Sequence, residues 1–63
     1  MKLRDFLFMS DSLDNELSIY CKGKKVYEGD INDFLKNENI DGDIITWFSY
    51  KGYYEPAISF EIT

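Results

Sequence analysis

The pattern of apolar and polar positions predicts short helices and strands in alternating groups. Near the amino terminus, Leu3, Phe6 and Leu7 have the i, i+3, i+4 spacing of an amphipathic helix, which we place at residues 2–9. The polar residues 10–15 then end this helix. The chain therefore opens with one short helix that has a single apolar face.

A β-hairpin is predicted next. Residues 16–22 alternate between apolar and polar side chains with period two, and residues 26–28 do so more weakly. We place the turn at Gly23 and Lys24. Cys21, the only cysteine, continues the apolar side of the alternation, so we interpret it as a small core residue rather than a reactive thiol.

A second helix is predicted after this hairpin. Asp30 is a suitable amino-terminal cap, and Asp33 falls at the third helical position, where an acid also interacts favourably with the helix dipole. Ile31, Phe34 and Leu35 form its apolar face. The two aspartates thus have a structural reason to be present.

The last part of the chain predicts a second hairpin, with strands at 44–50 and 57–62 and a turn at Lys51 and Gly52. Pro56 cannot donate a ladder hydrogen bond, so it belongs at the start of a strand or on an edge. We therefore expect a single α+β domain over residues 1–63. Its order is αββαββ, with a four-stranded, largely antiparallel sheet and both short helices on one face.

The length of the second turn decides which side chains face the core. With a loop of two or four residues, Phe48 and Tyr50 share one face with Ser59 and Glu61, whereas a loop of three residues inverts the assignment. In the first case, Ile45 and Trp47 lie on the core face with Ile58 and Phe60. The open face then carries four aromatic residues: Tyr20, Tyr27, Phe48 and Tyr50.

Three interpretations of these open-face aromatics remain. They could stabilise the sheet as cross-strand pairs, form a contact surface for another molecule, or stack on single-stranded nucleic acid. The chain has eleven aromatic residues, five Phe, five Tyr and one Trp, which is more than a domain of this size readily buries. The acidity of the whole chain disfavours direct nucleic-acid binding.

The net charge of −5 is concentrated in one stretch. Between residues 28 and 43, one base, Lys36, stands against six acids: Glu28, Asp30, Asp33, Glu38, Asp41 and Asp43. These acids either keep the protein soluble or complement a basic partner surface. A separate group of lysines, Lys22, Lys24 and Lys25, lies just before them.

The composition argues against catalysis and against a cofactor. The chain contains no histidine and one cysteine, so Ser-His and Cys-His nucleophile pairs and mixed Cys/His zinc sites are excluded. Residues 37–44 resemble the start of a calcium-binding loop, but the twelfth position should be a bidentate Glu and is Phe48. We predict no metal site. The apolar run at residues 6–9 is too short for a signal peptide or a membrane span, so we expect a cytoplasmic protein.

The first half of the chain resembles a known group of proteins. Its landmarks are Met1-Lys2-Leu3, Asp5-Phe6-Leu7, Leu17-Ser18-Ile19-Tyr20, Val26-Tyr27-Glu28-Gly29 and Asp33-Phe34-Leu35. This series resembles the short acidic proteins of bacteriophages and mobile elements of low-GC Gram-positive bacteria. The resemblance implies a setting inside a host cell, where some such proteins inhibit host factors, CRISPR nucleases among them.

The leading hypothesis is a non-catalytic inhibitor of a host protein, of the anti-CRISPR or another anti-defence type, that occupies a basic nucleic-acid-binding surface. The six acids between 28 and 43 would replace phosphates, and the apolar anchors would be Trp47, Tyr50, Tyr53 and Tyr54. One alternative is a homodimer that pairs through an edge strand. Another is a small regulatory protein that contacts nucleic acid through the three lysines at 22, 24 and 25.

Overall fold

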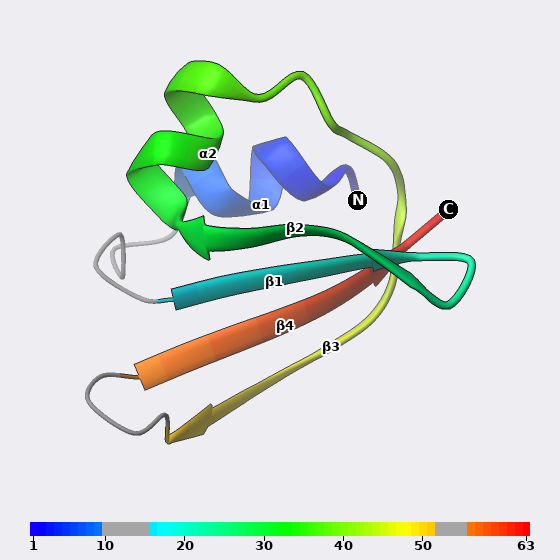
Figure 1. Ribbon diagram of the computed structural model, residues 1–63. Coiled ribbons are helices and arrows are strands. Elements are labelled where there is room, and N and C mark those ends of the chain that lie inside the picture. Colours follow the sequence, from blue (N-terminus) through cyan, green and yellow to red (C-terminus); the bar gives the residue numbers. More distant parts are fainter. Residues whose placement is uncertain (10–15, 52–55) are drawn as a thin grey trace.

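The computed structural model describes residues 1–9, 16–51 and 56–63, and its element order confirms the predicted αββαββ fold (Figure 1). The elements are α1 (Leu3–Met9), β1 (Glu16–Cys21), β2 (Lys24–Asp30), α2 (Ile31–Asn37), β3 (Ile44–Lys51) and β4 (Pro56–Ile62). Pro56 is the first residue of its strand, as its missing N–H requires.

The strands form a four-stranded sheet in the order β2-β1-β4-β3. β1 pairs antiparallel with β2, and β3 pairs antiparallel with β4. The two central strands, β1 and β4, run parallel. The sheet is therefore largely antiparallel, as predicted, and it is mixed because the two hairpins lie side by side through a parallel central pair.

Both helices cover the same face of the sheet, and the core lies between the two layers. Each helix and the two central strands contribute fully buried apolar side chains, at most 2% exposed: Leu3, Leu7, Leu17, Ile19, Ile31, Phe34, Phe60 and Ile62. Burying one such side chain stabilises the fold by about 1.5–3 kcal/mol relative to leaving it in water. These side chains fill the layer between the helices and one face of the sheet. Neither described helix lies on the other face.

The first hairpin turns one residue earlier than predicted. Lys22 and Gly23, with φ of 54° and 80°, form the two-residue turn, and Cys21 pairs with Lys24. Two consecutive positive φ angles are typical of a type I′ turn, whose twist matches that of the flanking strands. Cys21 is partly buried and packs against the core, in agreement with its interpretation as a core residue.

A β-bulge in each hairpin corrects two predictions about side-chain direction. In the first, Ile19 pairs with Tyr27 but Tyr20 pairs with Lys25, so Val26 is an extra residue and Tyr27 faces the helices, not the open side. In the second, the register shifts between Ile44 and Thr46, and Ile45 is 58% exposed instead of lying in the core. Period-two alternation does not reveal an inserted residue, which is why both predictions failed.

Arg4 joins the two helices. Its guanidinium group donates hydrogen bonds to the carbonyl oxygens of Glu38 and Leu35, both at 2.8 Å, beyond and within the last turn of α2. It also lies 5.2 Å from the centre of the Phe34 ring. A cation at this end of a helix satisfies carbonyls that lack intrahelical partners and interacts favourably with the helix dipole.

We predict that replacing Arg4 with Met lowers the free energy of unfolding by about 1–3 kcal/mol, because two charge-assisted hydrogen bonds are lost. The stability of Arg4→Lys should lie between those of the wild type and Arg4→Met, since an ammonium group cannot donate from two separate nitrogen atoms as the guanidinium group does. Urea denaturation measures the effect. Lys36→Met is the matched control, because it removes one exposed positive charge from the last turn of α2. Equal effects of Arg4→Met and Lys36→Met would show that only charge matters.

Candidate binding surface

The face of the sheet without helices carries three cross-strand rows of side chains. The strand registers place Tyr20, Glu61 and Thr46 in the first row. The second row is Ser18, Ser59 and Phe48, and the third is Glu16, Ala57 and Tyr50. Phe48 pairs with Ser59 and Lys51 with Pro56, which leaves four residues between β3 and β4 and confirms the assignment of Phe48 and Tyr50 to the open face.

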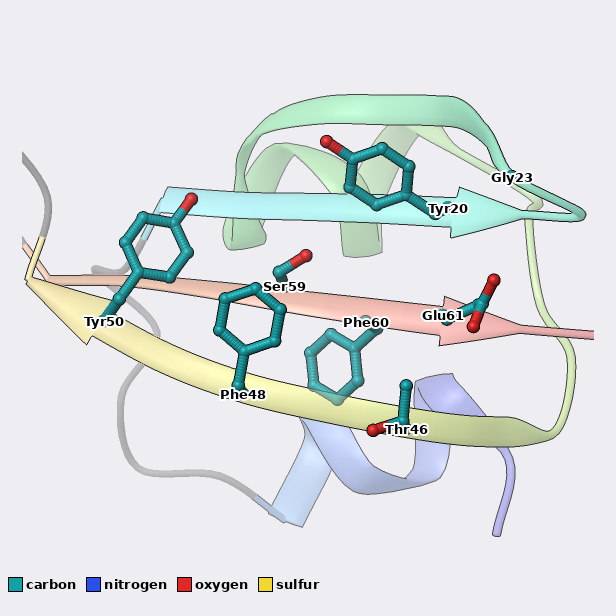
Figure 2. Close-up of a pocket in the computed structure, with 8 residues that line it drawn as sticks. All are labelled: Tyr20, Gly23, Thr46, Phe48, Tyr50, Ser59, Phe60 and Glu61. Atoms are coloured by element: carbon teal, nitrogen blue, oxygen red, sulfur yellow. The ribbon is translucent and has the colours of Figure 1, made fainter.

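The central strand of this face carries small side chains between larger ones. Figure 2 shows Ser59 between Tyr20 on one side and Phe48 and Tyr50 on the other. Ser59 is only 6% exposed, and Ala57 only 1%, although neither of the two described helices covers them. In contrast, Phe48 is 59% exposed and Tyr50 is 45% exposed. The aromatic rings therefore stand above a floor of small residues.

A hollow of about 440 Å³ lies on this face. Among its lining residues are Tyr20, Thr46, Phe48, Tyr50, Ser59 and Glu61 (Figure 2). Its volume falls within the range of about 300–1,000 Å³ that is usual for ligand pockets. The rings of Phe48 and Tyr50 lie 5.5 Å apart and form one continuous apolar wall along β3.

Acidic side chains exceed basic ones on this face. Its rows place Glu16, Glu28 and Glu61 on the open side, against Lys25. The Nζ atom of Lys25 lies 3.3 Å from a carboxylate oxygen of Glu28, and this hydrogen bond raises the pKa of Lys25. Lys25 is therefore already paired, and Glu61 is one of the residues that line the hollow. The open face, defined by these rows, combines aromatic rings with negative charge.

The six acids between residues 28 and 43 do not form one surface. Glu28 lies on the open face, whereas Asp30 caps α2 by accepting a hydrogen bond from the Asp33 N–H at 3.2 Å. Asp41 accepts hydrogen bonds from the backbone N–H groups of Arg4 and Gly42 at 3.2 and 2.8 Å. Asp43 forms an exposed ion pair of 3.6 Å with Lys2. Several of these acids therefore have structural roles.

Tyr27 lies near three of the six acids. Its hydroxyl donates to the carbonyl oxygen of Asp30 at 2.9 Å, and its ring packs edge-on against Phe34. Burial raises the pKa of Tyr27, and the negative charges of Asp33, Glu38 and Asp30 raise it further. The acids at 30, 33 and 38 thus form a second, smaller negative region around α2.

Gly29 allows Tyr27 to take this position. Its φ is 155°, a conformation that other residues rarely adopt. A Cβ atom at residue 29 would lie 2.9 Å from the Tyr27 hydroxyl oxygen. The Tyr-x-Gly segment of the sequence thus has a steric basis.

The predicted aromatic anchors are also divided. Tyr50 lies on the open face, but Trp47 lies on the helix face, where its ring is 5.5 Å from Phe6 and 6.3 Å from Phe60. The predicted anchors Tyr53 and Tyr54 fall outside the described residues. The predicted site also omitted Tyr20, Phe48 and Glu61, although the turn-length argument had placed all three on one face in the four-residue case.

Residues 1–9, 16–51 and 56–63 contain no group of three or more Cys, Asp or Glu side chains placed to hold a metal ion. The segment that resembled a calcium loop leads into β3, a strand. Neither of the helices described is long and apolar enough to cross a membrane.

Comparisons with protein-family models, with curated proteins and with solved structures gave no match.

The raised pKa of Tyr27 can be tested by titration. Above the ordinary value of 10.0, the unfolded chain releases this proton while the folded protein retains it. The contribution to stability is therefore full below pH 10 and is lost as the pH rises through the raised pKa. In an ultraviolet phenolate titration, we expect a late-ionising group that disappears in Tyr27→Phe. Titration of the wild type in concentrated guanidinium chloride is the control, since all five tyrosines of the unfolded chain should then ionise near the ordinary value, without a late group.

Proposed function

We propose that the protein is a non-catalytic binding protein that attaches to a basic surface of another protein through its open sheet face. An inhibitory role against a host enzyme that handles nucleic acid, as the resemblance to phage proteins implies, belongs to this proposal. The observation that carries it is the open face itself. Three aromatic side chains, those of Tyr20, Phe48 and Tyr50, line a hollow there, and within residues 1–9, 16–51 and 56–63 neither helix covers it.

Exposed aromatics on one face favour a binding role because they can bury a large area at low cost in side-chain entropy. Tyrosine is also enriched among the residues that dominate binding energy in protein interfaces. Phe48, Tyr50 and Tyr20 come from strands held in the sheet by main-chain hydrogen bonds. Such a surface is largely preorganised, which reduces the entropy lost on binding.

The charge of the protein favours a basic partner. Its net charge is −5, and acids exceed bases both on the open face and around α2. Opposite charge increases the rate of encounter and selects against acidic partners. Because the acids at 28–43 are spread over several surfaces, the proposal assigns them long-range attraction and assigns contact to the open face.

The proposal predicts selective capture. Immobilised protein, incubated with a lysate of a Gram-positive host, should retain a basic protein that mass spectrometry identifies and that then binds when purified. Phe48→Ser and Tyr50→Ser should each weaken that binding at least about tenfold, because they remove interface anchors. Phe8→Ser is the control, since Phe8 is 68% exposed on α1. Added salt should weaken binding steeply. Equal binding by all four proteins, or binding unaffected by salt, contradicts the proposal.

A second candidate, a homodimer through β3, is favoured by the character of that strand. β3 is the last strand in the sheet order and has eight residues, of which only Lys51 is charged. Long, apolar, uncharged edge strands readily pair with another chain. Ile45 and Trp47, which are 58% and 47% exposed, would lie near such a junction.

The dimer candidate predicts that the mass in sedimentation equilibrium rises from 7.4 kDa towards twice that value as concentration increases. Ile45→Lys should keep the protein monomeric, because it places a charge at the bulge of β3. Val26→Lys is a matched control, since Val26 is the bulged residue of β2 at the other edge of the sheet. A constant mass of 7.4 kDa for the wild type removes this candidate.

A further inference from the structure

The hollow on the open face has the shape of a channel over β4. Tyr20 stands on β1, and Phe48 and Tyr50 stand on β3, so the two walls are separated by the strand between them (Figure 2). Two strand spacings correspond to about 10 Å. Ser59 forms the floor and is almost fully buried. A flat group can therefore lie over Ser59 between the aromatic side chains of the two flanking strands.

One end of the channel carries a carboxylate. Glu61 lies in the same cross-strand row as Tyr20 and Thr46, and it is half-buried. Figure 2 shows its side chain between Tyr20 and Thr46, at the end of the channel near Gly23, with Phe48 and Tyr50 farther along β3. Aromatic faces attract cations through the ring quadrupole, and a nearby carboxylate adds a direct charge and two acceptor oxygens. This combination selects a positively charged group.

A positively charged side chain of the protein itself already lies against one of these aromatic rings. The Nζ atom of Lys25 lies 5.8 Å from the centre of the Tyr20 ring, which is a cation–π arrangement. Lys25 is also held by Glu28, on the side of Tyr20 that faces β2. Phe48, Tyr50 and Glu61 lie on the opposite side, towards β3, and the described residues place no Lys or Arg side chain against their rings or carboxylate.

We propose that the channel receives an arginine side chain from a basic segment of the partner protein, an inference that rests on the proposed function. The guanidinium group would lie between the rings of Tyr20 and Phe48 and form hydrogen bonds with the Glu61 carboxylate. Arginine fits better than lysine because its guanidinium group is planar, stacks on aromatic faces, is weakly hydrated and binds carboxylates through two parallel hydrogen bonds. The partner is thus recognised by an exposed arginine rather than by general positive charge.

The test is a nuclear magnetic resonance titration of the ¹⁵N-labelled protein with the blocked tripeptide Gly-Arg-Gly. We expect shifts of the Thr46, Ser59 and Glu61 amide signals and weaker binding of Gly-Lys-Gly. The same peptide with citrulline, which keeps the shape and loses the charge, should produce no saturable shift. Glu61→Gln, Phe48→Leu and Tyr20→Leu should each weaken arginine binding about fivefold, since each removes one charged or π interaction.

Asp5→Asn is the matched control, because it removes one exposed negative charge from α1, on the helix side, and should leave the titration unchanged. The fluorescence of Trp47, on the opposite face of the sheet, reports whether each variant keeps its fold. Equal binding of the arginine and citrulline peptides, shifts confined to α2, or no binding overturns the inference. Tighter binding of oligothymidylate to the same residues also overturns it, in favour of a nucleic-acid stacking surface.

The two proposals fail separately. If capture of a basic protein depends on Phe48 and Tyr50 but the tripeptide does not bind, the proposed function stands and the arginine channel is wrong. If the tripeptide binds in the channel but no captured protein depends on this face, the channel stands and the proposed function is wrong.

Discussion

The parallel pairing of β1 with β4 is the interaction on which the structure depends. It joins the two hairpins into one sheet, and its register aligns Leu17 with Ile58 and Ile19 with Phe60 on the helix side. The same register necessarily aligns Ser18 with Ser59 and Tyr20 with Glu61 on the other side. Because side chains alternate strictly along a strand, a slip of one residue would exchange the core with the open face. The core and the candidate binding surface are thus set by one pairing.

The two helices complete this arrangement from one side only. Phe34 of α2 packs against Tyr27 of β2, and Phe6 of α1 packs against Trp47 and Phe60. Arg4 then joins the helices through the carbonyl oxygens at the end of α2. With two helices of seven residues each, the chain has enough apolar surface to cover one face of the sheet. The aromatic residues Phe48 and Tyr50 on the other face remain exposed, since neither described helix covers them.

Much of the fold could be predicted from the sequence because local signals agreed with one another. The i, i+3, i+4 spacing around Leu3, the capping geometry of Asp30 and the period-two strands each involve residues close in the chain. The bulges at Val26 and Ile45 could not be predicted, since an inserted residue depends on the partner strand and leaves no local pattern. These two residues decided whether Tyr27 and Ile45 faced the core.

The candidate site was harder to predict because the sequence shows which residues are charged but not which face of the sheet their side chains occupy. The acids from Glu28 to Asp43 are the most visible feature of the chain, yet Asp30 caps a helix and Asp41 accepts backbone hydrogen bonds beside Arg4. Glu61, in contrast, is a single acid in an apolar strand, and its importance follows only from its row between Tyr20 and Thr46. A carboxylate placed beside aromatic rings over a buried floor interacts with a bound cation more strongly than one surrounded by water, because the local dielectric constant is lower. For the proposed arginine channel, the position of one acid on the sheet therefore matters more than the number of acids in a stretch.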